Sequence, residues 1–422
     1  MKKTCSIIIC LAVTAALMTS CGNEAKESNA VSGGTEASET ITMPKGGSAV
    51  IPSLNIKKYD IPQNDSLDFV RKMKIGWNLG NTFDANSDTN NIPNELDYES
   101  KWCGTKTTKQ MIDTIKAAGF NTIRIPVSWH NHVSGDNFTI SKEWLDRIQE
   151  VVDYAVDNDM YVILNIHHDI YEQYYYPTNK CFETSTKYMT AIWTQLCERF
   201  GDYDDHMIFE SINEPRFKGT KYDWWLDMSK PECQEAVECI NKLNQVFVDT
   251  VRATGGNNKT RYLMVPGYCA AADYVILDEF RLPQDIAENK NKVIVSVHAY
   301  TPYNFALQSS AENGSVSDWE PDNQKSTGDI DRLMDNLYGM YVMNGTPVVI
   351  GEFGARDKNG NLQDRVNYAS YYIAAARARG ITCLWWDNNA FAGTGENFGL
   401  LMRQTSTWTY PDIVLGMMKY AE

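Results

Sequence analysis

The sequence lacks the cysteine spacing that marks a disulfide framework or a zinc site. Its 422 residues include 10 cysteines, but no two of them form a Cys-x-x-Cys pair. Seven lie beyond residue 21, and an odd number cannot all be paired within one chain. Cys269 and Cys383 lie in apolar runs, so we expect them to be small core residues.

Positive charge is also scarce. The 39 lysines and arginines face 54 aspartates and glutamates, which leaves a net charge of -15. This balance argues against nucleic acid or another anionic polymer as the partner. With 43% hydrophobic and 22% charged residues, the chain has the composition of an ordinary globular protein with a sizeable core. It contains no internal repeat.

The N-terminus has an apolar stretch that is too short to span a membrane as a mature helix. Residues 6–18 have the length of a signal-peptide core and follow Lys2 and Lys3. The stretch ends in Leu-Met-Thr-Ser-Cys-Gly, which resembles a bacterial lipobox with Cys21 as the lipidated residue. We therefore predict a lipoprotein-type signal peptide over residues 1–20 and a secreted protein anchored to a bacterial membrane or cell surface. The alternative is an ordinary secretory signal with a chance cysteine.

Residues 21–60 are predicted to be a flexible tether. Residues 23–43 are rich in Ser, Thr, Glu, Gly and Ala and show no apolar periodicity. The remaining residues, 61–422, are predicted to form a single domain.

Strand-like and helix-like segments alternate through this domain. The near-continuous apolar runs are typical of parallel strands buried on both faces, and they cover residues 74–81, 122–128, 161–167, 207–213, 262–266, 293–300, 347–351 and 381–386. Helical periodicity lies between them, at 107–118, 142–158, 185–200, 231–253, 274–280, 330–343 and 362–379. This alternation predicts an α/β fold, the (β/α)8 TIM barrel.

Polar and ionisable residues gather where these runs end. In a barrel of this kind, the carboxyl ends of the strands carry the catalytic groups. The predicted ring consists of Asn81, Arg124, His167, His168, Asn213, Glu214, His298, Tyr300, Glu352 and Trp386. Two glutamates far apart in sequence, Glu214 and Glu352, suggest an acid and a nucleophile that face one substrate bond.

Six motifs along these strands are similar to those of glycoside hydrolase family 5, the cellulase-like retaining β-glycanases. They are Ile-Arg-Ile-Pro, Ile-His-His-Asp, Asn-Glu-Pro, His-Ala-Tyr, Gly-Glu-Phe-Gly and Leu-Trp-Trp-Asp. Gly-Trp-Asn-Leu-Gly-Asn-Thr and Trp-Trp-Asp-Asn further resemble subfamily 4, which is rich in endoglucanases, lichenases and xyloglucanases. The resemblance extends from residue 74 to the C-terminus.

The resemblance implies a role for each residue of the ring. Glu214 is the implied acid/base and Glu352 the nucleophile, with carboxyl groups roughly 5–5.5 Å apart. Arg124 would hold Glu352 ionised, and Glu214 beside that charge would keep its proton more easily. The other implied roles are the sugar 2-hydroxyl for Asn213, carboxylate orientation for His298 and Tyr300, and stacking under the sugar for Trp386.

Several further residues have two interpretations each. His167 is expected to point inward, His168 is either a sugar contact or a support, and Asp169 is expected to stabilise the loop. Trp144 and Trp193 lie on helices and are expected in the core. The aromatic residues expected in loops are either subsite platforms or loop anchors: Trp129, Trp224, Trp225 and Trp319.

These observations predict a membrane-tethered, retaining endo-β-1,4-glucanase that acts on β-glucan polysaccharides or oligosaccharides. We expect a monomer that needs no metal or cofactor and binds no nucleic acid. A xyloglucanase, lichenase or mannanase of the same fold is the alternative, and a non-catalytic glycan-binding lipoprotein is another. A metal-dependent barrel hydrolase is the rival from a different enzyme class, with His167, His168, Asp169 and His298 as its raw material. The strand-end pair His167-His168 lacks the His-x-His spacing that would place both ligands on one strand face and favour this rival.

Overall fold

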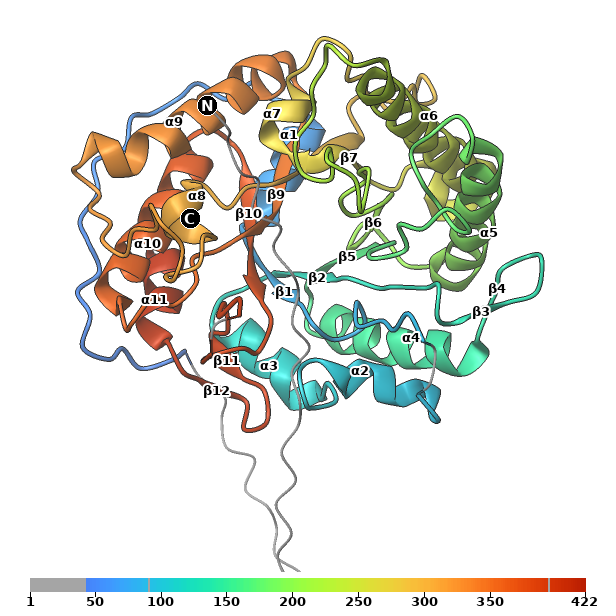
Figure 1. The fold of residues 1–422 in the computed structure, drawn as a ribbon. Coiled ribbons are helices and arrows are strands. Elements are labelled where there is room, and N and C mark those ends of the chain that lie inside the picture. The colour runs from blue at the N-terminus through green and yellow to red at the C-terminus, as the bar shows by residue number, and fades with distance from the viewer. Residues whose placement is uncertain (1–42, 90–91, 394) are drawn as a thin grey trace, which may run out of the picture. The chain divides into compact units, whose positions relative to one another are not determined.

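Eight parallel strands close into a barrel in the computed structural model, which describes residues 43–89, 92–393 and 395–422 (Figure 1). The order around the barrel is β1-β10-β9-β8-β7-β6-β5-β2. The strands are β1 (Ile75–Leu79), β2 (Thr122–Ile125), β5 (Tyr161–Asn165), β6 (Met207–Glu210), β7 (Leu263–Ala271), β8 (Val293–His298), β9 (Val348–Phe353) and β10 (Thr382–Asp387). The predicted TIM barrel and all eight of its strands are confirmed.

A helix follows each strand and packs on the outside of the barrel. In chain order these are α3 (Lys109–Ala117), α4 (Lys142–Val156), α5 (Phe182–Phe200), α6 (Pro231–Ala253), α7 (Ala272–Val275), α9 (Gln324–Met340), α10 (Leu362–Ala378) and α11 (Pro411–Lys419). Ser141 caps α4 by accepting a hydrogen bond from the backbone N–H of Trp144. Gly119 ends the turn after α3 with φ +104°, a conformation that favours glycine.

The barrel interior is closed at its amino-terminal end by a helix that the sequence patterns did not predict. This helix, α1 (Asp65–Lys72), places Phe69 and Val70 in a buried cluster with inward residues of β5, β6, β8, β9 and β10. The Phe69 ring stacks on Tyr262 with centroids 3.7 Å apart. Because one end is plugged, the opposite end is left for the polar residues.

Residues 43–60 differ from the expected tether. Gly47 N–H donates to Asp412, Leu54 N–H donates to the Tyr420 hydroxyl at 3.0 Å, and the Tyr59 hydroxyl donates to Asp335 at 2.6 Å. This segment therefore belongs to the same compact unit as the barrel, and the prediction of a tether as far as residue 60 is wrong. The signal peptide, Cys21 and the rest of the predicted tether lie outside the described residues.

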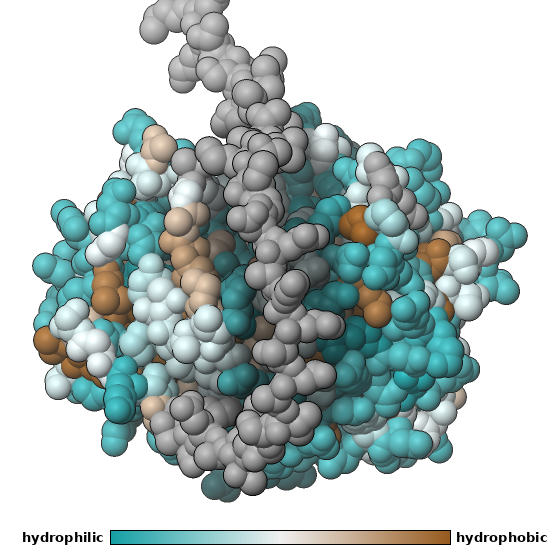
Figure 2. Space-filling view, turned by 90° about the horizontal axis from the view of Figure 1, so that it is seen from below, coloured by the Kyte–Doolittle hydropathy of each residue, from teal (hydrophilic) through white to brown (hydrophobic). Residues whose placement is uncertain are grey.

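The apolar residues of the chain are used mainly in the core. Trp144 and Trp193 are fully buried, as predicted, and the seven cysteines beyond residue 21 are buried and free. The face in Figure 2 is mostly hydrophilic, with hydrophobic residues in small separate patches. Across the part of the chain that the structure describes, no helix combines the length and apolarity needed to cross a membrane.

Candidate active site

Strand register brings the predicted polar residues to one level of the barrel. Asn78 of β1 is the register partner of Arg124 on β2 and of Trp386 on β10. His298 at the end of β8 is the partner of Glu352 on β9. In parallel strands, register partners point to the same side of the sheet, so these side chains meet inside the barrel near the carboxyl ends of the strands.

Arg124 is the hub of this cluster. Its fully buried guanidinium donates to Glu210 Oε2 at 2.7 Å, to Glu352 Oε1 at 2.7 Å, to Asn213 Oδ1 at 2.7 Å and to Asn78 Oδ1 at 3.1 Å. Burial alone would lower the pKa of Arg124, but the two carboxylates outweigh it and raise that pKa above its ordinary value. The guanidinium is a permanent positive charge in contact with Glu352.

Glu352 is held at both of its oxygens. Oε1 accepts from Arg124, and Oε2 accepts from the Tyr300 hydroxyl at 2.9 Å. Burial, with the negative charge of Glu352, raises the pKa of Tyr300 well above its usual value, so Tyr300 remains a hydrogen-bond donor. An arginine and a neutral phenol that both donate to one carboxylate favour its ionised form.

Glu214 has a different set of partners. Its Oε1 lies 2.8 Å from His298 Nδ1, and its Oε2 lies 3.7 Å from the Arg216 guanidinium. His298 Nδ1 is also 3.6 Å from Glu352 Oε2, so the imidazole lies between the two carboxylates. The three ligand-type atoms of Glu214, His298 and Glu352 lie within 4.8 Å of one another.

Opposing effects act on the protonation of Glu214. Burial favours the neutral acid, but the hydrogen bond and charge of His298, with help from Arg216, lower the pKa of Glu214 overall. Burial opposes charge on His298 too, yet Glu352 and Glu214 raise the pKa of that imidazole. Both directions favour a hydrogen bond in which His298 Nδ1 donates to Glu214 Oε1, and the two groups titrate as a pair. The direction for Glu214 is opposite to the expectation that the charge of Glu352 helps it keep its proton.

The four remaining ring residues lie in β10 or directly after β1 and β5. Trp386 is buried, and its ring is parallel to His167 with centroids 5.9 Å apart. His167 Nδ1 accepts from the Asn165 amide at 3.1 Å, whereas the His168 side chain is 32% exposed. Asn81 lies in the turn after β1 with φ +58° and is half-buried. Asp169 accepts from the backbone N–H groups of Trp129 and His130, as predicted for a loop-supporting residue.

The interpretation as a sugar subsite is wrong for two of the four candidate aromatic residues. Trp129 is fully buried and its indole N–H donates to Asn165 O at 2.9 Å. Trp319 is 1% exposed, and its indole donates to Ser326 O at 3.1 Å. Each ring is held inside by a backbone carbonyl, so neither offers a face to a sugar.

The other two aromatics remain candidates. Trp224 is 49% exposed, and the Arg216 guanidinium lies 4.0 Å from its ring centroid. Trp225 is 73% exposed. Trp102, which the sequence analysis did not single out, is 41% exposed and has its ring 5.8 Å from that of His168. Exposed rings therefore flank the cluster on two different loops.

Sequence reasoning also missed the residues that hold Arg124 and His167 in place. Glu210 accepts from Arg124, from the Asn165 amide at 3.0 Å and from the Ser296 hydroxyl at 2.6 Å. Asn78 donates to Gly351 O at 2.8 Å. These residues could have been found in the sequence as polar residues inside apolar strand runs. Asn78, Asn165 and Glu210 all fit this description.

Replacing Glu210 by alanine is expected to lower the free energy of unfolding by about 3–5 kcal/mol, because it leaves the buried Arg124 Nε–H and two neutral donors without an acceptor. Denaturant unfolding measures this. Glu210→Gln keeps an acceptor and should cost less. Glu143→Ala, on the exposed face of α4, is the control and should stay within about 0.5 kcal/mol. Equal losses for Glu210→Ala and Glu143→Ala would contradict the prediction.

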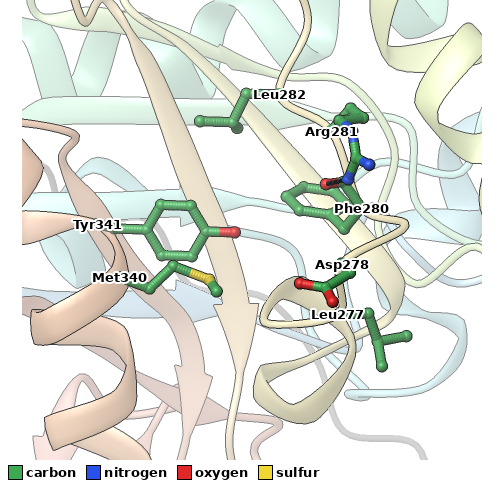
Figure 3. A pocket seen from close by; sticks show the side chains of 7 residues that line it. All are labelled: Leu277, Asp278, Phe280, Arg281, Leu282, Met340 and Tyr341. Atoms are coloured by element: carbon green, nitrogen blue, oxygen red, sulfur yellow. Dashed lines mark hydrogen bonds between the residues drawn. The ribbon is translucent and has the colours of Figure 1, made fainter.

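A surface pocket of about 450 Å³ lies away from these residues (Figure 3). It lies between the segment after α7 and the end of α9, and none of the predicted site residues lines it. Its lining consists of Leu277, Asp278, Phe280, Arg281, Leu282, Met340 and Tyr341. Of its polar side chains, the Tyr341 hydroxyl donates to Val275 O and the Arg281 guanidinium donates to Phe280 O.

Comparisons with known proteins identify relatives of this arrangement. The family model described as Cellulase (glycosyl hydrolase family 5) matches residues 83–392. Endoglucanase A of Clostridium longisporum is 41% identical over 384 residues, which are 89% of this chain and 70% of that protein. Endoglucanase B of Ruminococcus albus is 43% identical over 357 residues, 84% of this chain and 80% of that protein.

Solved structures of family 5 enzymes are also similar to this chain. One is a family 5 lichenase from Caldicellulosiruptor sp. F32, solved as a glutamate-to-glutamine mutant in complex with cellotetraose. It is 65% identical to this chain, with a TM-score of 0.88 over 89% of this chain and 100% of that one. A GH5-4 broad specificity endoglucanase from Ruminococcus champanellensis with bound cellotriose has a TM-score of 0.76 at 43% identity, covering 85% and 100%.

Proposed function

Because this chain belongs to glycoside hydrolase family 5, we propose that it is an endo-β-1,4-glucanase that cleaves internal bonds of β-glucans, mixed-linkage glucan included. It is a retaining glycoside hydrolase. The single observation that carries the mechanism is the spacing of Glu214 and Glu352, whose carboxylate oxygens approach within 4.8 Å of each other. Inverting enzymes keep the two carboxyl groups roughly 6.5–9.5 Å apart to admit a water, whereas retaining enzymes bring them closer.

The partners of each glutamate support distinct roles. Glu352 accepts from Arg124 and Tyr300, two groups that stay protonated, and this arrangement suits a nucleophile that must be ionised. Glu214 contacts the His298 imidazole, which can exchange a proton with it. Glu214 therefore acts as the acid/base. It protonates the leaving oxygen in the first step and deprotonates water in the second.

The remaining ring residues position the sugar in this proposal. Asn213 accepts from Arg124 through its Oδ1, which leaves its amide N–H groups for a sugar hydroxyl. Trp386 and His167 form a wall of two parallel rings. His168 and Asn81 complete the polar lining.

The substrate class rests on the relatives and on the exposed rings. The matched enzymes are named endoglucanases and a lichenase, and two of their structures hold cellotetraose or cellotriose. Trp102, Trp224 and Trp225 offer flat apolar surface on two loops, which favours an open cleft for a chain rather than a pocket for a chain end. Xyloglucan or mannan is the alternative substrate within the same fold.

We expect the purified protein to lower the viscosity of soluble β-glucan quickly while it releases reducing ends slowly, because random internal cuts shorten long chains first. A panel of carboxymethyl cellulose, lichenan, xyloglucan and mannan, followed by viscometry and product analysis, tests this. Release of glucose from chain ends alone would contradict endo-action, and activity on mannan alone would exclude the glucanase assignment.

We also propose that the mature protein is anchored through lipid on Cys21. Each buried methylene of a lipid chain contributes about 0.8 kcal/mol to membrane binding, so several chains on one cysteine hold a protein firmly. Cys21→Ser is expected to release the enzyme from the membrane fraction or to leave the precursor unprocessed. Fractionation and N-terminal mass analysis measure this. A native protein found wholly in the medium, with another N-terminal residue, would exclude the anchor.

A further inference from the structure

The loop that follows Glu214 folds back on itself around Arg216. Arg216 Nη1 donates to the backbone carbonyl of Glu214 at 2.9 Å, and Nε donates to Asp223 Oδ1 at 2.9 Å. The guanidinium carbon also lies 4.0 Å from the centroid of the Trp224 ring. One side chain therefore joins the two ends of the loop, and one of those ends carries the proposed acid/base.

Asp223, the partner of Arg216, is itself fixed. Its Oδ2 accepts from the backbone N–H of Gly219 at 2.8 Å, and its backbone carbonyl accepts from Cys269 Sγ at 3.4 Å. The backbone N–H of Cys269 in turn donates to Pro215 O at 2.9 Å. Because Cys269 belongs to β7, both ends of the loop are attached to the barrel wall, and Arg216 has a defined position between them.

The charge of Arg216 also reaches the carboxylate of Glu214. Nη1 lies 3.7 Å from Glu214 Oε2, too far for a hydrogen bond but close enough for a strong electrostatic effect. The two side chains are 12% and 16% exposed, so solvent and salt screen the pair only in part. The proposed hydrolysis assigns no role to this charge.

We propose that Arg216 is a positioning residue for the acid/base: held by Asp223, it fixes the backbone of Glu214, and its charge determines the upper pH limit of hydrolysis. In this role Arg216 acts through Glu214 and does not contact the bond that is cleaved. The inference rests on the proposed function and adds a residue to it.

Titratable groups from several other elements also face Glu214. His298 of β8 bonds to it, and Glu352 of β9 lies on the far side of that imidazole. The others are His168 and Tyr175 in the loop after β5, Cys269 of β7, Tyr300 after β8 and Glu396 in the loop after β10. Burial raises the pKa of Tyr175, of Cys269 and of Tyr300, so these three side chains are neutral at neutral pH.

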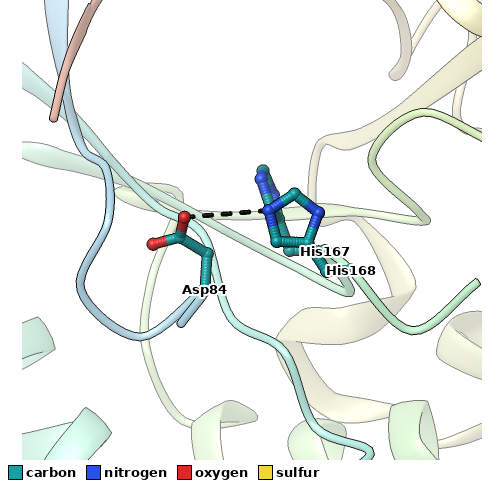
Figure 4. A group of neighbouring side chains, drawn as sticks. All are labelled: Asp84, His167 and His168. Atoms are coloured by element: carbon teal, nitrogen blue, oxygen red, sulfur yellow. Dashed lines mark ion pairs between the residues drawn. The ribbon is translucent and has the colours of Figure 1, made fainter. Parts of the chain in front are cut away.

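His168 can carry positive charge, but its charge is lost at neutral pH. Its Nε2 lies 3.9 Å from Asp84 Oδ2, and Figure 4 shows it beside His167 and facing Asp84. Burial nevertheless lowers the pKa of His168 to about 4. Arg216, in contrast, is a permanent positive charge beside Glu214.

Loss of the charge at position 216 should raise both pKa values of the Glu214–His298 pair. Burial raises the pKa of Glu214, and His298 and then Arg216 lower it. A cation favours the ionised carboxylate and opposes protonation of the imidazole, so without it the pair keeps its proton to higher pH. The sign is the same whichever of the two groups carries the proton. Because the leaving group of a polysaccharide needs a proton, the alkaline limit of hydrolysis should move up.

The pH dependence of kcat/KM on lichenan, a neutral soluble β-glucan, tests the proposal, because it reports the ionisations of the free enzyme. For Arg216→Gln we expect the alkaline limb to move up by about one pH unit. Asp223→Asn removes an anion and frees the guanidinium to approach Glu214, so its alkaline limb should move down.

Two further variants separate charge from shape and from remote effects. Arg216→Lys keeps the positive charge, but its ammonium has no planar fork to bond Glu214 O and Asp223 together. Its alkaline limb should therefore lie closer to that of the wild type than to that of Arg216→Gln, while kcat falls. Arg332→Gln makes the same substitution on α9, where the side chain is 70% exposed and pairs with Asp329, and it should leave the limb in place.

NMR titration of the isotope-labelled full-length protein reads the pair without substrate. The signal that His298→Gln removes identifies the imidazole, and its midpoint should rise in Arg216→Gln. A protein that hydrolyses no β-glucan would refute the proposed function, whereas this titration would still test the role of Arg216.

The inference is overturned if Arg216→Gln leaves both the alkaline limb and the His298 midpoint in place and only lowers the rate. It is also overturned if Asp223→Asn moves them in the same direction as Arg216→Gln. If Arg216→Gln does not fold, the direction of the shift in Asp223→Asn decides.

Discussion

Replacing Glu352 by glutamine should abolish hydrolysis of both polysaccharide and activated aryl glycosides, by about 10⁴-fold or more, or at least 5.5 kcal/mol of transition-state stabilisation. An amide oxygen cannot form the glycosyl-enzyme ester, and no leaving group compensates for a missing nucleophile. Arg124 would also lose one of its two buried carboxylate partners. Initial rates on soluble β-glucan and on a dinitrophenyl cellobioside measure the effect.

The fold of this variant must be checked separately. Glutamine keeps one oxygen that accepts from Arg124, and its amide N–H can donate to the Tyr300 hydroxyl, so thermal unfolding should show a folded protein. The exposed Glu143→Gln should retain full activity. A Glu352→Gln protein that is folded and still turns over the aryl glycoside would exclude Glu352 as the nucleophile.

The barrel could be predicted because its strands carry an unambiguous pattern. Residues 207–213 and 347–351 are mainly apolar, and each range is followed directly by a glutamate. The structure places β6 and β9 there. The short α7 was the least regular helical segment, and it covers only Ala272–Val275. The plug helix α1 was missed because its burial depends on the open end of the barrel, which no local pattern reveals.

The site was harder to predict where its residues act through one another. A tryptophan in a loop presents its face to solvent only if its indole N–H finds no carbonyl inside. The indole N–H groups of Trp129 and Trp319 donate to buried backbone carbonyls, and both rings are buried. Trp225, in contrast, is exposed. Glu210 belongs to no recognisable motif, and its contacts with Arg124 and Ser296 appear only once β2, β6 and β8 are parts of one closed barrel. The hydrogen bond between His298 and Glu214 likewise joins residues 84 positions apart in the sequence, so no local pattern predicts it.

Replacing Glu214 by glutamine should give the second large effect, and this effect should depend on the leaving group. General acid–base help is worth about 10²–10⁴-fold, so hydrolysis of polysaccharide, whose sugar leaving group needs a proton, should fall by that amount. A dinitrophenolate needs no proton, so formation of the intermediate from that substrate should be nearly unaffected.

The pH dependence should change in the same variant. In the proposed mechanism the leaving group takes its proton from Glu214, which is hydrogen-bonded to His298, and the pKa of His298 is raised above its ordinary value by Glu352 and Glu214. Polysaccharide hydrolysis should therefore hold at lower pH and decline as the pH rises through the upper pKa of the pair. With Glu214→Gln and the aryl substrate this alkaline decline should disappear from intermediate formation, measured as a burst of phenolate.

Breakdown of the intermediate in Glu214→Gln lacks a base to deprotonate water. Azide needs no base: it attacks the anomeric carbon of the ester, the Glu352 carboxylate leaves, and the product is a β-glycosyl azide. Added azide should therefore restore steady turnover of the aryl substrate in Glu214→Gln, and it should restore none in Glu352→Gln, which forms no ester to attack. Rescue of the Glu352 variant, or an α-configured azide from the Glu214 variant, would mean that the two roles are exchanged. Near-wild-type activity in both variants would show that the pair is a buried hydrogen-bonded cluster without a catalytic role.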